Sequence, residues 1–250
     1  MSHYMQKYHK TILSVYEQVM QEEQAIGKAA ALMTSAILDD KLIHVFGPGG
    51  HSNMGAYEMF WRAGGLVPIN AILDPGTAVQ YGAKRSNHIE RLHGYTKAVF
   101  DAYRISDGVI IIVNAYGINS MTIDAALEAK KRSVPSIGIG STTFGKNVPE
   151  GHPARHPSNK NLYELVDVFV DCHMPYGDAV VDFEGVEQKV GPTSTLANCF
   201  TINLVVVETV RQLVEKGYDP PLWMSANIPG GDESNRKYEE KYGFRIKHLL

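Results

Sequence analysis

Residues 42–53 have the sequence LIHVFGPGGHSN, an apolar segment followed at once by a glycine-rich turn and a hydroxyl side chain. The apolar half is typical of a buried strand, and apolar residues at helical spacing follow the turn. A turn from a strand into a helix directs free backbone N–H groups and the positive end of the helix dipole at one point, which suits an anion. We expect such a site here, and its residues would be Gly49, Gly50, Ser52 and Asn53.

Two further segments have a similar order of elements. Residues 109–120, VIIIVNAYGINS, pass from an apolar strand through an amide-rich turn into a helix, and residues 192–195, PTST, open a long apolar helix. The side-chain hydroxyl and amide groups in these segments can donate hydrogen bonds. Several such turns around one sheet edge predict a site for a small phosphorylated, hydroxyl-rich ligand. Its further candidate contacts are Asn114, Gly117, Asn119, Ser120, Thr193, Ser194 and Thr195.

The composition is that of an ordinary globular chain. Of the 250 residues, 44% are hydrophobic and 20% are charged, and the net charge of −3 gives no electrostatic reason to expect a nucleic-acid partner. The two cysteines, Cys172 and Cys199, lack metal-type spacing and indicate a reducing compartment. The first residues lack the apolar stretch of a signal peptide, and no apolar run is long enough to cross a bilayer. We therefore expect a cytoplasmic protein without a membrane partner.

Strand-like and helical segments alternate after a long N-terminal helix, which the apolar spacing predicts over residues 5–38. The strand segments are continuous apolar runs, as expected for a parallel sheet covered by helices on both faces. This pattern predicts an α/β fold. The expected strands are 42–46, 66–72, 109–113, 134–139 and 166–171, and the expected later helices are 53–63, 89–105, 120–132 and 194–216.

Two stretches interrupt the alternation. Residues 141–161, rich in Thr, Gly, Pro, His and Asn, predict a long loop, and residues 179–190 predict a small β-hairpin that turns at Glu184–Gly185. We expect one domain over residues 1–217. A C-terminal tail over residues 218–250 would pack on that domain or on a neighbouring subunit.

Two nucleotide-binding motifs nearly match. Gly47, Gly49 and Ser52 stand where a dinucleotide fingerprint has its three glycines, but serine hinders the close packing that the third glycine allows. The sequence GSTTFGKN at residues 140–147 imitates a P-loop. However, its last residue is not the Ser or Thr that would hold Mg²⁺, and Pro149 disfavours the helix that should follow. A phosphate site is therefore favoured over an NAD-type site or a purely structural turn, and a nucleoside triphosphatase is not expected.

Ten histidines raise the question of a metal centre. His152 and His156 are four residues apart, but a proline follows each of them and makes a helical pair improbable. The sequence Asp-Cys-His at residues 171–173 ends a strand without a second cluster to accompany it. We therefore expect neither a metal nor another cofactor.

Two glutamates are candidate bases. Glu58 stands among apolar residues of the helix expected after Ser52, and Glu90 begins the next expected helix. A carboxylate against an apolar wall has its pKa raised toward neutrality, as proton abstraction beside a carbonyl requires. Two structural roles are equally open: Glu58 could lie on a solvated helix face, and Glu90 could stabilise a helix dipole.

With these features in this order, the chain resembles the sugar isomerase (SIS) domain family, whose members bind phosphosugars. The similarity covers roughly residues 5–217 and is strongest to phosphoheptose isomerases and to uncharacterised phosphosugar-binding proteins with a similar tail. The resemblance implies a flavodoxin-like three-layer α/β/α sandwich around a five-stranded parallel sheet. It also implies a homodimer or tetramer with sites near subunit contacts. In this family pattern a strand ends near Ser141, which joins the candidate contacts.

The resemblance also implies roles for individual residues. Ser52 would bind phosphate together with the amides of residues 49–51, and Thr193, Ser194 and Thr195 would complete the anion pocket. The turn after Val113 lacks the family's serines, so that its asparagines would contact the sugar.

The catalytic pattern departs further from the family. Phosphoheptose isomerases resemble one another in a His-x-x-x-Glu pair on the first helix. In this chain, Glu58 and Arg62 occupy those two positions. The last helix has neither a histidine nor an acid before Glu208, where those enzymes carry a Glu-x-x-His-type element. The resemblance therefore implies a phosphosugar pocket, but not the heptose reaction or its metal.

The leading hypothesis is a phosphosugar isomerase that interconverts an aldose and a ketose through an enediolate, with Glu58 or Glu90 as the base. His51, His93 or His173 would polarise the carbonyl or open the sugar ring. The alternatives are a non-catalytic phosphosugar sensor and an ether-cleaving phosphosugar lyase. Four tail residues would close over a pocket, either in the same subunit or in a neighbouring one, or would only stabilise a subunit interface. They are Asn227, Asp232, Glu233 and Asn235.

Overall fold

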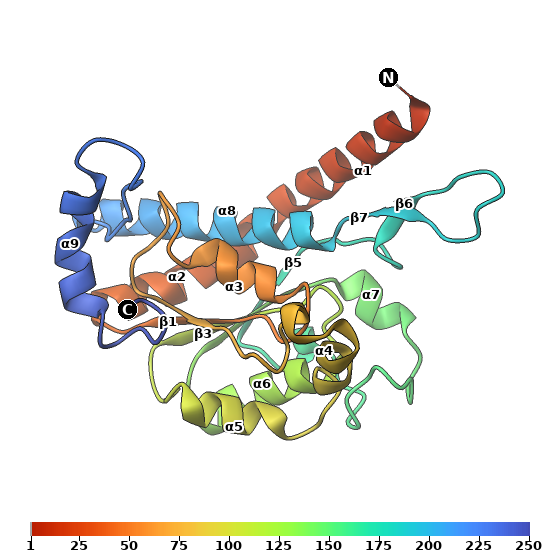
Figure 1. The fold of residues 1–250 in the computed structure, drawn as a ribbon, viewed down its shortest axis with the longest axis horizontal. Coiled ribbons are helices and arrows are strands. Elements are labelled where there is room, and N and C mark those ends of the chain that lie inside the picture. The colour runs from red at the N-terminus through yellow and green to blue at the C-terminus, as the bar shows by residue number, and fades with distance from the viewer. Residues whose placement is uncertain (1) are drawn as a thin grey trace.

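A five-stranded parallel sheet forms the centre of the molecule, with the strand order β2-β1-β3-β4-β5 (Figure 1). The structure, a computed structural model, describes residues 2–250. The parallel pairing confirms the α/β fold that the continuous apolar runs predict. The strands are β1 (Ile43–Phe46), β2 (Ile69–Ile72), β3 (Val109–Val113), β4 (Ser136–Gly140) and β5 (Val168–Asp171).

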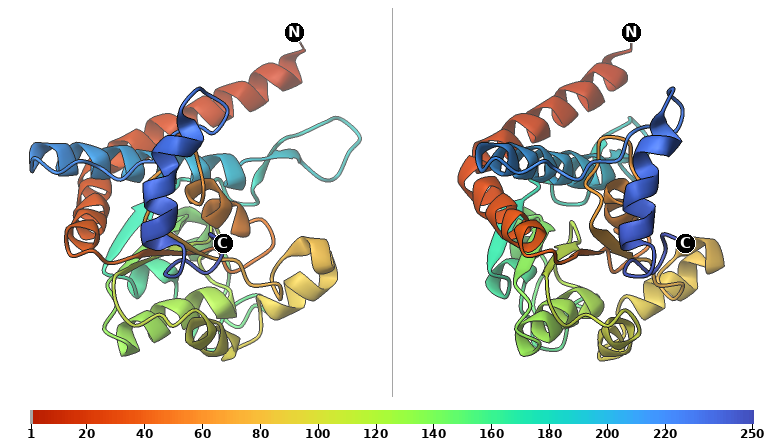
Figure 2. Two further views of the ribbon diagram at one scale, coloured as in Figure 1. Left: turned by 60° about the vertical axis from the view of Figure 1, so that its left-hand side comes forward. Right: turned by 90° about the vertical axis from the view of Figure 1, so that its left-hand side faces the viewer.

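Helices cover both faces of the sheet (Figures 1 and 2). Side chains of β3 alternate between the two layers: Ile111 and Val113 pack in the core with α2 and α8, whereas Ile110 and Ile112 pack with α5 and α6. This arrangement confirms the three-layer α/β/α sandwich. The covering helices are α2 (Glu23–Leu38), α3 (Asn53–Met59) and α8 (Ser194–Glu215) on one face, and α5 (Tyr95–Ala102) and α6 (Ser120–Lys131) on the other.

The long N-terminal helix is not continuous. α1 (His3–Val19) is followed by a 3-10 turn at Met20–Glu22 before α2 begins. The interruption coincides with the polar residues 21–24, which break the apolar spacing of the predicted helix. As a result α1 buries little apolar surface and projects from the body of the molecule beside the hairpin (Figure 1).

Three other boundaries differ from the prediction. The helix expected over 89–105 begins only at Tyr95, as α5, because Gly94 before it has φ +87°, in the left-handed region. α4 (Ala83–Ile89), which lies almost wholly before that range, was not predicted. The helix expected over 53–63 ends at Met59, since Phe60 has an extended backbone. The loop expected over 141–161 begins with a short helix, α7 (Thr142–Asn147).

The predicted hairpin is present. β6 (Ala179–Val181) and β7 (Val190–Pro192) pair in antiparallel orientation. The hairpin packs against α1, since the ring of Phe183 stacks on Tyr4 at a centroid distance of 4.0 Å. Short 3-10 turns lie at Val79–Tyr81 and Leu162–Glu164.

The C-terminal tail packs on its own domain. An antiparallel bridge joins Leu66 to Leu222, and the Trp223 N–H donates to the carbonyl of Gly65 at 3.0 Å. The tail then forms α9 (Gly231–Tyr242). The buried Asn235 donates to the Met224 carbonyl at 2.8 Å and accepts the Met224 N–H at 2.9 Å. The other three tail residues considered above are exposed, namely Asn227, Asp232 and Glu233.

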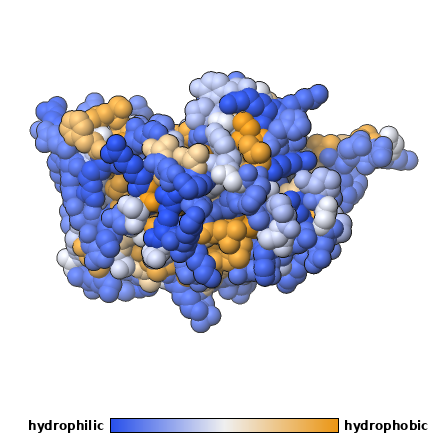
Figure 3. Space-filling view, turned by 90° about the horizontal axis from the view of Figure 1, so that it is seen from below, coloured by the Kyte–Doolittle hydropathy of each residue, from blue (hydrophilic) through white to orange (hydrophobic). Residues whose placement is uncertain are grey.

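The face formed by α5 and α6 is mostly hydrophilic, and its apolar side chains form separate patches rather than one continuous band (Figure 3). A helix that covers a sheet packs its apolar face on the sheet and exposes its polar face to solvent. Across residues 2–250, no helix combines the length and the apolar character that a bilayer crossing requires.

Replacing Asn235 tests the attachment of the tail. Asn235→Ala removes both hydrogen bonds to Met224 and leaves a buried backbone pair without partners, and we expect the free energy of unfolding to fall by about 1–3 kcal/mol. Denaturant titration measures the change. The exposed neighbour Ser234 serves as control, since Ser234→Ala should stay within about 0.5 kcal/mol of wild type. Equal stability of Asn235→Ala and wild type would contradict this account of the tail.

Candidate functional site

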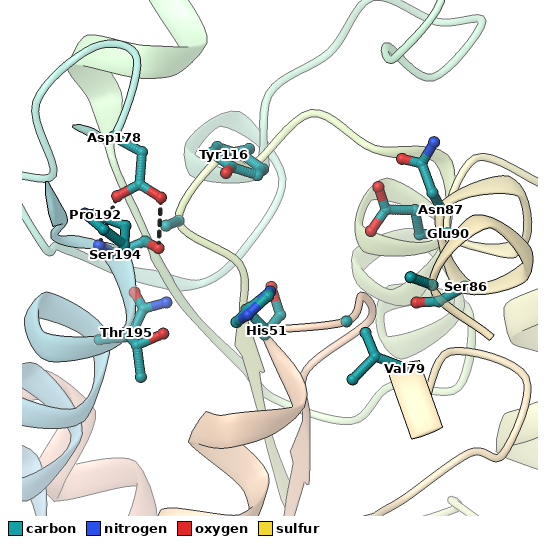
Figure 4. Close-up of a pocket in the computed structure, with 15 residues that line it drawn as sticks. His51, Val79, Ser86, Asn87, Glu90, Tyr116, Asp178, Pro192, Ser194 and Thr195 are labelled. Carbon is teal, nitrogen blue, oxygen red and sulfur yellow. Dashed lines mark hydrogen bonds between the residues drawn. The ribbon is translucent and has the colours of Figure 1, made fainter. Parts of the chain in front are cut away.

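The largest hollow near the predicted turns lies at the carboxyl ends of β1 and β3, where α8 begins (Figure 4). β1 has β2 on one side and β3 on the other, so the chain order reverses here, as it does at ligand sites of open α/β sheets. The cavity volume of about 420 Å³ falls in the range of small-molecule sites. The cavity is lined by Gly50, His51, Ser52, Val79, Ala83, Ser86, Asn87, Glu90, Ala115, Tyr116, Asp178, Pro192, Ser194, Thr195 and Asn198.

The first turn forms one wall of this pocket. A Cβ at Gly47 would lie 1.8 Å from the Ser52 carbonyl oxygen, so the tight turn requires glycine there. Gly49 has φ +153°, and a Cβ on it would lie 2.6 Å from Glu90 Oε2. The Ser52 side chain does not cap its own helix, which leaves its hydroxyl available to the pocket. Glu90 and Ser52 therefore meet at the same turn.

A carboxylate of the protein already occupies the start of α8. Asp178 Oδ1 accepts the N–H groups of Thr193 and Ser194, each at 2.7 Å, and Oδ2 accepts the Ser194 hydroxyl at 2.9 Å (Figure 4). Thr193 also donates its hydroxyl to the Asp178 carbonyl. Thr193 and Ser194, which the sequence predicts as phosphate contacts, thus have an internal anion as their partner, whereas Thr195 faces the cavity.

Among the carboxyl groups of the pocket, Glu90 has a strongly raised pKa. It follows the last residue of α4, and burial raises the pKa of its carboxyl from 4.5 to about 7. Tyr116 lies between Glu90 and Asp178, which stand on opposite sides of the pocket (Figure 4). Burial, and then the two carboxylates, raise the pKa of Tyr116 to about 12, so its hydroxyl stays protonated. The pocket therefore combines a carboxyl that exchanges its proton near pH 7 with a permanent phenol donor.

The structure does not bring all candidate acids and histidines to this pocket. Glu58 accepts a hydrogen bond from Asn203 at 3.0 Å and pairs with Arg62 at 3.3 Å, beside a separate hollow. His173 Nε2 lies 2.9 Å from Glu22 Oε1, beneath the N-terminal 3-10 turn. His93 pairs with Asp124. Of the three candidate histidines, only His51 lines the pocket.

Several candidate contacts have internal partners that brace the turns. Asn114 Oδ1 accepts the N–H groups of Tyr116 and Gly117 at 3.0 and 2.9 Å. Asn53 donates to the Thr77 carbonyl, and Asn119 donates to the Ala154 carbonyl. Buried amide side chains in these positions satisfy backbone groups and hold the turns in shape.

Two candidate hydroxyls are also buried. Ser120 lies in the first turn of α6, and Ser141 donates to the Met174 carbonyl at 2.7 Å. Neither residue lines the pocket.

Other lining residues were not among the predicted contacts. Asp178 precedes Thr193 and Ser194, whose N–H groups it accepts, by 15 and 16 residues. The hairpin between them brings Asp178 to the start of α8. Asn198 is 5% exposed, and its Oδ1 has no hydrogen-bond partner among residues 2–250. Its position four residues after Ser194 places both on one helix face, a spacing that could have identified it.

A second hollow of about 390 Å³ adjoins the first and shares Asn87, Glu90 and Tyr116 with it. The rings of Phe144 and Tyr176 form part of its wall, with centroids 5.4 Å apart. Glu90 and Tyr116 thus contact both hollows. For a metal, the donor atoms that converge among residues 2–250 are those of His93, Asp124 and His156, outside both hollows.

Comparison with known proteins identifies the family. Residues 7–141 match the SIS domain. A UPF0309 protein of Caldanaerobacter subterraneus is 38% identical over 230 residues, which cover 90% of this chain and 92% of the relative. A UPF0309 protein of Geobacillus thermodenitrificans is 37% identical over 230 residues, covering 92% and 90%.

Among solved structures, a phosphoheptose isomerase from Francisella tularensis has a TM-score of 0.53 at 14% identity and covers 83% of this chain and 96% of its own. This similarity shows a shared fold. The resemblance that the sequence indicated is confirmed by the domain match and the relatives together. The chain belongs to the SIS domain family and is a relative of the UPF0309 proteins.

Proposed function

We propose that this protein binds a phosphorylated sugar in the pocket between the β1–α3 turn and α8, and that it isomerises the sugar with Glu90 as the base. The observation that carries the proposal is the half-buried Glu90 carboxyl, with its pKa near 7, in a cavity lined by hydroxyl and amide groups. Membership of the SIS domain family, whose proteins bind phosphosugars, supports the ligand class.

The polar groups of the pocket suit a hydroxyl-rich ligand. Ser52 and Thr195 provide hydroxyl groups, and the nearly buried Asn198 provides an acceptor without a protein partner. An unpaired buried acceptor costs about 1–3 kcal/mol, which a hydroxyl of the ligand would relieve. The cavity of about 420 Å³ has room for one sugar phosphate.

The charges of the pocket indicate where the phosphate binds. Asp178 neutralises the first amides of α8 and would repel a second anion there. We therefore place the phosphate across the cavity, at the amides and hydroxyl of residues 50–52, with Thr195 facing it. Glu90 adjoins this turn.

The same residues account for the proposed chemistry. Ionised Glu90 removes the proton from C2, beside the aldehyde carbonyl, and returns it to C1. The hydroxyl proton of O2 passes to O1, so that the aldose becomes a ketose through an enediolate. A pKa near 7 suits both steps, because the base is ionised in about half of the molecules and its conjugate acid can donate. Tyr116 donates its proton in a hydrogen bond to the developing oxyanion. His51, at the same turn, assists ring opening.

Replacing Ser52 tests the location of the phosphate. We expect members of a sugar-phosphate panel to raise the Tm of the wild type, and Ser52→Ala to bind them about 5–30-fold more weakly, the equivalent of one or two hydrogen bonds. Ser234→Ala is the control. If no sugar phosphate stabilises the wild type, the pocket assignment is wrong, and an unaltered response of Ser52→Ala would move the phosphate elsewhere.

Replacing Glu90 tests the base. Glu90→Gln should lower isomer interconversion and solvent-deuterium incorporation by at least about 100-fold while ligand-induced stabilisation remains. Glu58→Gln, in the separate hollow, is the matched control and should keep its activity. Full activity of Glu90→Gln would exclude it as the base. Binding without turnover in the wild type would identify a sensor, and loss of a substituent from C3 would identify a lyase.

Burial of Glu90 also predicts a pH dependence of stability. The folded protein keeps a proton on Glu90 up to about pH 7, whereas the unfolded chain loses it near pH 4.5, so the free energy of unfolding falls as pH rises between these values. Glu90→Gln should therefore be more stable than wild type at pH 8, by about 1–3 kcal/mol, with a smaller difference at pH 5. Denaturant titrations at both pH values measure this, and an identical difference at both would refute the raised pKa.

A further inference from the structure

Three side chains from separate segments converge outside the pocket. His93 precedes α5, Asp124 is on α6, and His156 is in the segment between α7 and β5. His93 Nδ1 lies 2.9 Å from Asp124 Oδ1 and 2.9 Å from His156 Nε2, and the latter two atoms are 3.3 Å apart. Asp124 and His156 are each 5% exposed, whereas the His93 side chain is 60% exposed.

Hydrogen bonds and a bound cation are the two ways in which these three atoms can converge. If each ring directs its proton at Asp124, two N–H groups stand side by side with their nitrogen atoms only 2.9 Å apart. If one of the two ring nitrogens is unprotonated, its lone pair and the Asp124 carboxylate oxygen both accept the single proton of the other ring. A cation at the centre satisfies all three atoms, because every one of them can present a lone pair to it.

We propose that His93 Nδ1, Asp124 Oδ1 and His156 Nε2 bind one divalent first-row transition metal ion, with Zn²⁺ as the reference ion. Atoms with these separations lie on a circle of radius about 1.8 Å, so a cation about 2.0–2.1 Å from each would lie about 1 Å out of their plane. Two imidazoles and one carboxylate are a donor set that zinc, nickel and iron accept. The exposed side of His93 leaves room for water to complete the coordination.

The surrounding contacts orient these ligands. The Gly94 N–H donates to the second oxygen of Asp124 at 2.7 Å, which fixes the carboxylate. Ser158 holds the His156 ring at Nδ1, where its Oγ lies at 2.7 Å and its backbone N–H donates at 3.0 Å. Metal-binding histidines characteristically have such an outer partner. The arrangement therefore has an outer shell as well as an inner one.

The ion would tie together segments that the backbone joins only loosely. The segment of His156 also supplies His152 and Ala154 to the second hollow, and α6 is held to Glu90 through the Met121 N–H. A metal at His93, Asp124 and His156 would therefore secure the outer wall of this hollow. None of the three ligands lines either hollow, which makes the ion structural and its binding independent of the proposed isomerase activity.

Zinc titration tests the proposal. Tag-free protein, stripped with a chelator, should bind one equivalent of Zn²⁺ tightly by calorimetry. His93→Gln should weaken that binding more than about 100-fold, since loss of an outer-shell partner alone costs about 10–100-fold. Because His93 is exposed, this variant should fold. His88→Gln removes an exposed histidine from the preceding helix as the matched control, and it should bind Zn²⁺ like wild type.

Two further readouts separate this site from adventitious surface binding. Ser158→Ala should weaken Zn²⁺ about 10-fold or more through the outer shell. Zn²⁺ should also slow tryptic cleavage after the exposed Lys160 in wild type but not in His93→Gln. The proposal would be overturned if the wild type bound Zn²⁺ no more tightly than His93→Gln. It would also be overturned if His88→Gln lost as much Zn²⁺ affinity as His93→Gln. Neither measurement depends on sugar-phosphate binding, which is tested separately by the thermal-shift assay.

Discussion

Burial of the sheet on both faces controls where polar chemistry can occur in this molecule. The residues of β1 and β3 are all buried, and β3 is wholly aliphatic. His44 is the polar residue within these two strands; it meets Asn70 at 3.0 Å and the Asp107 carbonyl at 3.1 Å, and burial lowers its pKa. Because packing fills the strand interiors, the groups that line the pocket come from the turns at the strand ends and from the helices and loops beside them.

Electrostatics within the pocket arise from two carboxyl groups with opposite environments. Asp178 accepts two backbone N–H groups and a hydroxyl. Glu90 has no such set of donors among the described residues, and burial raises the pKa of its carboxyl to about 7. Tyr116 stands between them. Two carboxyl groups in such different environments can divide the roles of hydrogen-bond acceptor and proton carrier.

Much of the fold was predictable from local pattern. The five apolar runs became the five strands, because only a doubly covered parallel sheet buries continuous apolar segments. Gly94 delays the start of one predicted helix and the polar residues 21–24 divide another, which shows that a few residues decide helix boundaries. Glu90 was expected to begin a helix, but it follows the end of α4. Within the candidate site, Ser52 was predictable from its turn. Asp178 was not, since the hairpin between distant segments brings it to α8, and no local spacing encodes that return.

The bridge between Leu66 and Leu222 has a consequence for biosynthesis. These residues are 156 positions apart, so the segment leading into the edge strand β2 is synthesised long before its partner. At about 5–20 residues per second, a ribosome needs about 8–30 s to reach Leu222. During that interval an unpaired backbone stands beside the sheet edge, where other chains can add as strands. Pairing of the tail with this segment ends the exposure.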